Sequence, residues 1–221
     1  MIYILEGFII GLLIPYMARR FAKFMPATPA YALYRLVAPH KIPLRSNPKQ
    51  KALKKAYLWR SLMAGGLGAL LAWAILFRFG EIECFWYMGF SLTLLLLAEI
   101  DGRTFLLPDI LTVPLLICGF VFASVSGGLT PFESAISALI GYILPTFAAL
   151  IMLSYDKEAF GGGDIKFLSA VGAWLGINGL LYTILLSCFL FGIYALIAKK
   201  RSGAFGPSIA GAAIIILLFG L

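Results

Sequence analysis

Long apolar runs are the feature that most restricts what this chain can fold into. A helix needs about 20 apolar residues to cross the hydrocarbon core of a bilayer. Of the 221 residues, 62% are hydrophobic and only 13% are charged, against roughly 25% charged in soluble domains. We therefore predict an all-α polytopic membrane protein with about eight transmembrane helices, seven being the alternative count. The expected spans lie near residues 2–18, 58–77, 84–100, 110–126, 134–154, 165–177, 179–198 and 207–221.

The positive charge of the chain follows this expected topology. The net charge is +8, and the one long hydrophilic stretch, roughly residues 19–56, contains many Lys and Arg but no acidic residue. By the positive-inside rule this stretch is cytoplasmic, and threading the other spans from it puts all Lys and Arg except Arg78 on that side. No basic residue precedes the first apolar run, so we expect a retained anchor rather than a cleaved signal peptide. Lys and Arg near a membrane also bind anionic lipid headgroups, and we expect no nucleic-acid partner.

Two regions are predicted. Residues 1–57 form an anchor helix and a basic cytoplasmic loop, and residues 58–221 form the membrane-embedded core. The three cysteines, Cys84, Cys118 and Cys188, are far apart and form no CxxC pair, and His40 stands alone. We therefore expect no metal site.

Acidic side chains gather at the predicted cytoplasmic edge. Acidic residues near membrane depth are rare and are functional hypotheses by default. Asp101 ends an apolar span, where a carboxylate is unfavourable against the helix dipole, so another group must hold it there. Asp109 follows Pro108 and has the position of a helix cap. Six of these residues lie at this edge: Glu99, Asp101, Asp109, Asp156, Glu158 and Asp164.

The stretch "GGGDIKFLSAVGAWLG" places three glycines before Asp164 at the start of a span. We expect Gly161, Gly162 and Gly163 to adopt positive φ and to allow close backbone approach. Loosened backbone at membrane depth is tolerated where it is buried in protein or lines a wet cavity. Helix packing could bring Asp101 beside Asp164, and two close carboxylates share a proton. One would then act as general base on water and the other as acid toward a carbonyl.

At these residues the chain resembles the type IV prepilin peptidases, integral-membrane aspartic proteases of the GxGD class. Three motifs carry the resemblance: "IDGRTFLLPDILT" from Ile100, "GGGDIKFLSAVGAWLG" from Gly161, and "AFGPSIAGA" from Ala204, which replaces a proline of the family pattern. The resemblance covers roughly residues 58–221. It implies that Asp101 and Asp164 are the catalytic pair, and that four further residues shape the site: Gly161, Gly163, Lys166 and Asp109.

The resemblance also implies a substrate and a location. Members cleave the short basic leader from type IV prepilins or type II secretion pseudopilins, at the cytoplasmic face of the bacterial inner membrane. Three acidic residues are candidates for binding a basic leader: Glu99, Asp156 and Glu158. The peptidase reaction needs no cofactor. Many members also methylate the new N-terminus with S-adenosylmethionine and carry paired CxxC motifs in the first loop. Here that loop has no cysteine and so departs from the methylating members. S-adenosylmethionine is needed only if this chain retains the methylation reaction.

Two other functions remain open from the residues alone. A proton- or ion-coupled transporter could use the same carboxylates as a relay, although such sites usually lie near the midplane and often accompany internal repeats. A non-catalytic chaperone for pilin assembly would need dispensable aspartates. The role of Lys166 is also open, since it could tune the charge of the pair or extend its ammonium group to the membrane interface.

Overall fold

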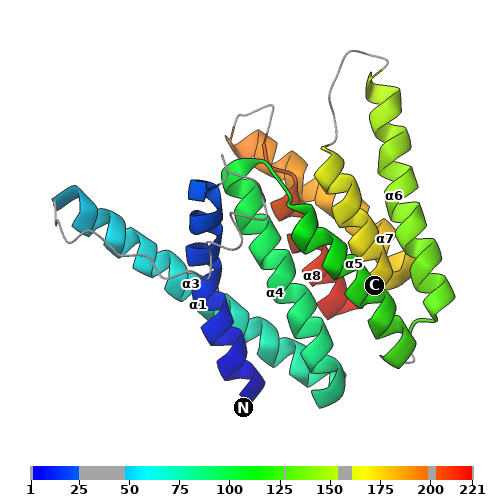
Figure 1. The fold of residues 1–221 in the computed structure, drawn as a ribbon, viewed down its shortest axis with the longest axis horizontal. Coiled ribbons are helices and arrows are strands. Elements are labelled where there is room, and N and C mark those ends of the chain that lie inside the picture. Colours follow the sequence, from blue (N-terminus) through cyan, green and yellow to red (C-terminus); the bar gives the residue numbers. More distant parts are fainter. Residues whose placement is uncertain (1, 25–47, 127, 154–160, 199–202, 221) are drawn as a thin grey trace. The chain divides into compact units, whose positions relative to one another are not determined.

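The computed structural model describes residues 2–24, 48–126, 128–153, 161–198 and 203–220 (Figure 1). The regular structure in these ranges is helical, which confirms the all-α prediction. Five of the helices are long and apolar enough to cross a membrane, whereas α5 and α8 are shorter apolar helices, so the count of about eight spans is not confirmed. The described helices are α1 (Ile2–Phe24), α3 (Pro48–Phe79), α4 (Glu81–Thr104), α5 (Asp109–Ser126), α6 (Pro131–Leu153), α7 (Gly162–Ala198) and α8 (Gly206–Phe219).

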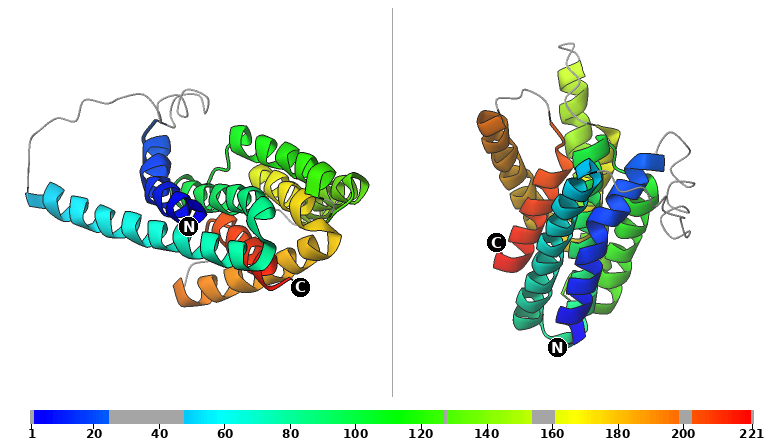
Figure 2. Two further views of the ribbon diagram at one scale, coloured as in Figure 1. Left: turned by 90° about the horizontal axis from the view of Figure 1, so that it is seen from below. Right: turned by 90° about the vertical axis from the view of Figure 1, so that its left-hand side faces the viewer.

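Helix α7 contains two of the predicted spans. The backbone of Gly176 is non-helical, with φ 70° and ψ −177°, while helix continues on both sides of it. Glycine adopts positive φ without the steric penalty that a Cβ brings. The segments before and after Gly176 run in clearly different directions (Figure 2). The sequence predicted two spans, 165–177 and 179–198, and the structure joins them through a kink instead of a loop.

The chain divides into two compact units, residues 1–92 and 93–221. In the first unit α1 packs against α3 at very short range. A Cβ added to Gly7 would lie 2.6 Å from the Gly68 carbonyl oxygen, and one added to Gly11 would lie 2.5 Å from that of Ala64. Small residues that let two backbones approach are typical of membrane helix pairs. The predicted division at residue 57 stays a prediction, and His40 with most of the basic loop lies outside the described residues.

In the second unit small residues pack α7 closely against α6. A Cβ added to Gly172 would lie 2.5 Å from the Ser137 carbonyl oxygen, so only glycine fits there. The Ser134 hydroxyl also donates a 2.7 Å hydrogen bond to the Ala173 carbonyl. Hydroxyls that reach across to a neighbouring helix are a common way to hold membrane helices together. The "SAVGA" part of the motif therefore anchors α7 and fixes the direction of its first half.

Trp174 joins α7 to α5. Its indole N–H donates to the Leu115 carbonyl at 2.8 Å, and its ring stacks on Phe122 with centroids 5.2 Å apart. A Cβ added to Gly119 would lie 3.0 Å from the Trp174 ring, so glycine lets the indole lie flat against α5. These contacts position α7, whose first turn carries Asp164, against the helix that begins at Asp109.

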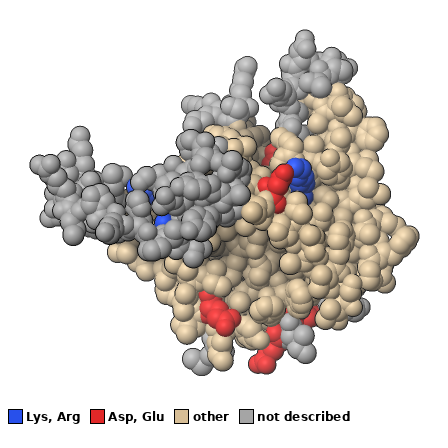
Figure 3. All heavy atoms as spheres, in the orientation of Figure 1, with Lys and Arg blue, Asp and Glu red and all other residues tan. Residues whose placement is uncertain are grey.

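Much of the described surface is apolar. Phe77 is 85% exposed, and Leu196 and Ile197 are each 79% exposed. On the face drawn in Figure 3, most of the described atoms belong to residues other than Lys, Arg, Asp and Glu. Together with the span-length helices, this surface identifies a multi-pass membrane protein.

Candidate functional site

Asp101 lies in the last turns of α4 and is only 5% exposed. Its Oδ2 accepts a 2.8 Å hydrogen bond from the backbone N–H of Gly206, the first residue of α8. The N-terminus of a helix has free N–H groups and a positive dipole end, so it stabilises a carboxylate. The start of α8 is therefore the group that holds the Asp101 carboxylate at the end of α4.

Gly206 is a site residue that the sequence analysis missed. A Cβ at this position would lie 2.7 Å from Asp101 Oδ2 and 3.0 Å from its Cβ and Cγ, so a side chain would displace the carboxylate. Pro207 follows in the first turn of α8, where a missing N–H costs nothing. The signal was present in "AFGPSIAGA", because a Gly-Pro pair before an apolar run marks a helix start that can approach another group closely.

Asp164 is the third residue of α7. Its N–H bonds to the Gly161 carbonyl at 3.0 Å, so Gly161 is the N-cap of α7. The Gly161 N–H in turn donates to the half-buried Asp164 carboxylate. This reciprocal arrangement resembles a capping box, with Asp at the position that Glu usually takes. The spacing of GxGD thus places the carboxylate over the first turn of its own helix.

The remaining glycines act through close approach and not through unusual backbone. Gly162 and Gly163 form the first turn of α7 with helical backbone, so the expectation of positive φ for them is wrong. A Cβ on Gly163 would lie 2.9 Å from the Cβ of Leu107, in the connection between α4 and α5. A Cβ on Gly162 would meet nothing within 4 Å. Gly163 therefore lets α7 start against the segment that follows Asp101.

The result is that the carboxylates of Asp101 and Asp164 lie close enough to interact electrostatically. Each is bound by a backbone N–H at the start of a helix, Gly206 for one and Gly161 for the other. Two nearby carboxylates in such a place can hold a single proton between them. A pair of this kind can take a proton from a water molecule and give one to a carbonyl oxygen.

Lys166 and Asp109 form an ion pair beside this site. The Lys166 ammonium lies 2.7 Å from Asp109 Oδ2, and the side chains are 42% and 61% exposed. Asp109 also lies in the first turn of α5, where a carboxylate complements the helix dipole. Ion pairs this exposed contribute about 0–1 kcal/mol. The contact joins the starts of α5 and α7, and the roles predicted for these two residues stay predictions.

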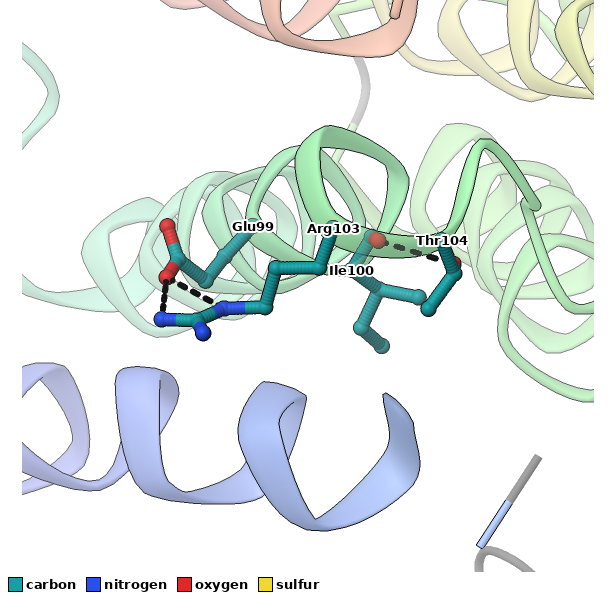
Figure 4. A network of polar contacts seen from close by, with 4 residues as sticks. All are labelled: Glu99, Ile100, Arg103 and Thr104. Atoms are coloured by element: carbon teal, nitrogen blue, oxygen red, sulfur yellow. Dashed lines mark hydrogen bonds and ion pairs between the residues drawn. The ribbon is translucent and has the colours of Figure 1, made fainter. Parts of the chain in front are cut away.

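Glu99 lies on a different side of α4 from Asp101. Figure 4 shows it engaged by Arg103, whose guanidinium donates two hydrogen bonds of 2.6 and 2.9 Å to Glu99 Oε1. One turn takes 3.6 residues, so residues two apart point about 200° from each other around the helix. Glu99 is therefore not part of the carboxylate pair. Asp156 and Glu158, the other candidates for binding a leader, lie outside the described residues.

No metal centre forms in the described ranges, since no three His, Cys, Asp or Glu side chains gather there. Cys84 is buried in α4, and Cys118 and Cys188 are exposed. None of the three is among the groups that contact the two aspartates in the interactions described above. The expectation that the protein works without a metal stays a prediction.

The sequence model of the type IV leader peptidase family matches residues 88–196, a range that includes both aspartates. Several similar proteins carry the name prepilin leader peptidase/N-methyltransferase. The one from Neisseria gonorrhoeae is 36% identical over 162 residues, which are 70% of this chain and 54% of that protein. The one from Xanthomonas campestris pv. campestris is 37% identical over 168 residues, 70% of this chain and 57% of that protein.

The protein of that name from Stutzerimonas stutzeri is 32% identical in an alignment of 238 positions that covers 92% of this chain and 79% of that protein. The chain spans little more than half the length of the first two relatives. No solved structure has significant similarity to it. The chain belongs to the type IV leader peptidase family, as the family model, these relatives, the motifs and the paired carboxylates all indicate.

Proposed function

We propose that this protein is a membrane aspartic endopeptidase that removes the basic leader from type IV prepilins or type II secretion pseudopilins. The observation that carries the proposal is the juxtaposition of Asp101 and Asp164, each bound by a backbone N–H at a helix start. Relatives named prepilin leader peptidase/N-methyltransferase support the choice of substrate.

In the proposed reaction the pair holds one proton and a water molecule. The ionised carboxylate takes a proton from water while the water oxygen forms a bond to the scissile carbonyl carbon. The protonated carboxyl gives its proton to the carbonyl oxygen, so the tetrahedral intermediate carries no net charge. The intermediate then collapses and the C–N bond breaks. The leaving nitrogen takes the proton of the protonated carboxyl, and one hydroxyl of the intermediate gives its proton to the other carboxylate, so the pair again holds one proton. Asp101 and Asp164 are the catalytic residues, and neither step needs a metal or cofactor.

We place the reaction at the cytoplasmic face of the bacterial inner membrane. The support is the distribution of Lys and Arg, which makes the basic stretch of residues 19–56 cytoplasmic by the positive-inside rule. The same topology puts the ends of α4 and α7 that bear the aspartates on that side. The proposed partners are the apolar helix of the substrate and the surrounding lipids.

The test is cleavage of a purified prepilin by the full chain in lipid nanodiscs. Asp101→Asn and Asp164→Asn keep the size of each side chain and remove its acid–base function, so each should lower kcat by about 10³-fold. Glu81→Gln is the matched control, because Glu81 is an exposed acid in the first turn of α4, whereas Asp101 lies in the last turns of that helix. Cleavage at the parent rate by either of the first two variants would reject the catalytic assignment.

Methylation is read from the same experiment. A mass spectrum of the processed N-terminus, taken with and without added S-adenosylmethionine, shows whether a methyl group is transferred. The transporter alternative has no support from the relatives, and proton flux in liposomes without any proteolysis would be needed to restore it.

A further inference from the structure

Phe105 has a backbone conformation that its residue type rarely adopts. Its φ is 54°, and it is the one non-glycine residue with positive φ in the described ranges. Left-handed backbone brings the Cβ of an ordinary residue too close to the neighbouring carbonyl, so it costs free energy. An outlier of this kind is a reason to look for a function.

The local cause is the end of α4. The Phe105 N–H donates to the Asp101 carbonyl at 2.9 Å, which closes the last turn of the helix with a left-handed residue. Glycine usually occupies that position because it has no Cβ. The chain instead carries an aromatic side chain there and accepts the strain.

Phe105 comes soon after Asp101 in the chain, and its side chain is open to its surroundings. Phe105 is 68% exposed and its neighbour Leu106 is 49% exposed. Phe105 follows Asp101 by four residues, and the next residue but one, Leu107, packs against Gly163 of the GxGD motif. The two exposed side chains therefore stand on the short connection from α4 to α5, which lies against the start of α7 through Leu107.

We propose that Phe105, with Leu106 beside it, is a docking surface for the apolar segment of the substrate that follows the scissile bond. The inference rests on the proposed function and names the residue that would recognise the substrate helix. A leader peptidase must hold an apolar helix so that the bond before it reaches the two aspartates. An exposed aromatic side chain four residues after Asp101 is suited to contact that helix.

A lipid-facing role is the competing explanation, and the backbone argues against it. The apolar span of α4 ends at Thr104, so Phe105 comes directly after the segment that the bilayer would cover. Phe132, which is 72% exposed in the first turn of α6, faces its surroundings from ordinary helical backbone. Strain is unnecessary for contact with lipid, whereas the left-handed backbone of Phe105 is tied by a hydrogen bond to Asp101, the residue that bears one carboxylate of the pair.

The first test separates binding from chemistry. Its probe is a synthetic peptide with a Lys-rich leader, one glycine and an apolar helix of about 20 residues. Phe105→Asn removes the ring and introduces a residue type that tolerates positive φ. We therefore expect KM to rise about tenfold, with kcat within about twofold of the parent. Phe105→Tyr keeps the ring and should restore the parental KM. Phe132→Asn, which removes an equally exposed ring at the start of α6, is the matched control.

The second test does not depend on cleavage. A photoreactive p-benzoylphenylalanine replaces Phe105 in the full chain carrying Asp164→Asn, in nanodiscs, and the same probe replaces Phe132 in a parallel sample. After irradiation with the peptide, mass spectrometry locates the adduct. The proposal expects an adduct from position 105 on the first residues after the glycine, and a much weaker one from position 132.

In the cross-linking test, three results would overturn the proposal: an adduct with lipid alone, an adduct on the leader, or equal yields from the two positions. An unchanged KM for Phe105→Asn would also overturn it. If the parent protein did not cleave the peptide but position 105 still formed the expected adduct, the docking surface would stand and the peptidase proposal would fail. If the parent cleaved and no such adduct formed, the reverse would hold.

Discussion

Replacing Gly206 by alanine would press a methyl group against the Asp101 carboxylate. The new Cβ would lie 2.7 Å from Oδ2 and 3.0 Å from Cγ, several tenths of an ångström short of ordinary van der Waals contact. The carboxylate must move away, and it then lengthens or loses its 2.8 Å bond to the Gly206 N–H. The perturbation therefore acts on the position of one carboxylate without removing any acid–base group.

The size of the effect follows from that displacement. A hydrogen bond to a charged group contributes about 1.5–3 kcal/mol, and a shift of about 1 Å in a reacting group lowers a rate about 10²-fold. We expect kcat to fall about 10²-fold for Gly206→Ala. Alanine is a better helix residue than glycine by about 0.5–1 kcal/mol, so part of the cost of the clash is offset and the melting temperature should change little.

The assay is cleavage of a prepilin in nanodiscs, with thermal unfolding measured on the same samples. Gly211→Ala is the matched control on the same helix, since its Cβ would meet only Leu190 Cδ1 at 3.9 Å. If Gly206→Ala cleaved within about threefold of Gly211→Ala, the role assigned to the start of α8 would be wrong.

Two further substitutions test the packing around the pair. Gly163→Ala would set a Cβ 2.9 Å from the Cβ of Leu107 and push the start of α7 away, so the rate of cleavage should fall at least about tenfold. Gly162→Ala is the control, because a Cβ there meets nothing within 4 Å, and it should cleave like the parent. Equal rates for the two variants would contradict the close approach of Gly163 to Leu107. Lys166→Met breaks an exposed ion pair with Asp109, so unfolding should change by less than about 1 kcal/mol and cleavage by less than about threefold. A tenfold loss of cleavage for Lys166→Met would show that the ammonium contacts the substrate or the pair.

Much of the fold and of the pair could be predicted because the determinants are local. Apolar runs near the length of a bilayer crossing predict helices whatever their neighbours are, and "LPD" and "GGGD" mark helix starts. The kink at Gly176 could not be predicted in the same way. A glycine between two apolar runs is equally consistent with a longer loop, whereas here the backbone is non-helical at Gly176, with φ 70°. The two expected spans correspond to the two helical segments on either side of this kink, and the sequence left open how short their junction is.

The partner of Asp101 shows what the sequence leaves undetermined. Its unfavourable place at a helix end predicted that something must hold it, but the holding group is a backbone N–H 105 positions away, at Gly206. A backbone donor has no residue-type signature, so composition cannot reveal it. The glycines of GxGD are a similar case. A glycine can be needed because a Cβ would clash or because the backbone has positive φ, and the sequence does not distinguish the two reasons. At Gly163 the contact with Leu107 shows that the reason is the clash.

We propose that Asp101 and Asp164 act as one unit that shares a proton. The most direct measurement compares kcat for Asp101→Asn, Asp164→Asn and the double variant on one prepilin substrate, with long incubations to follow slow cleavage. Residues that work as a unit lose about as much activity singly as together. We expect kcat to fall about 10³-fold in each single variant, and we expect the double variant to be no slower than the single ones. Losses that multiply in the double variant, or a single variant that retains the parental rate, would contradict it.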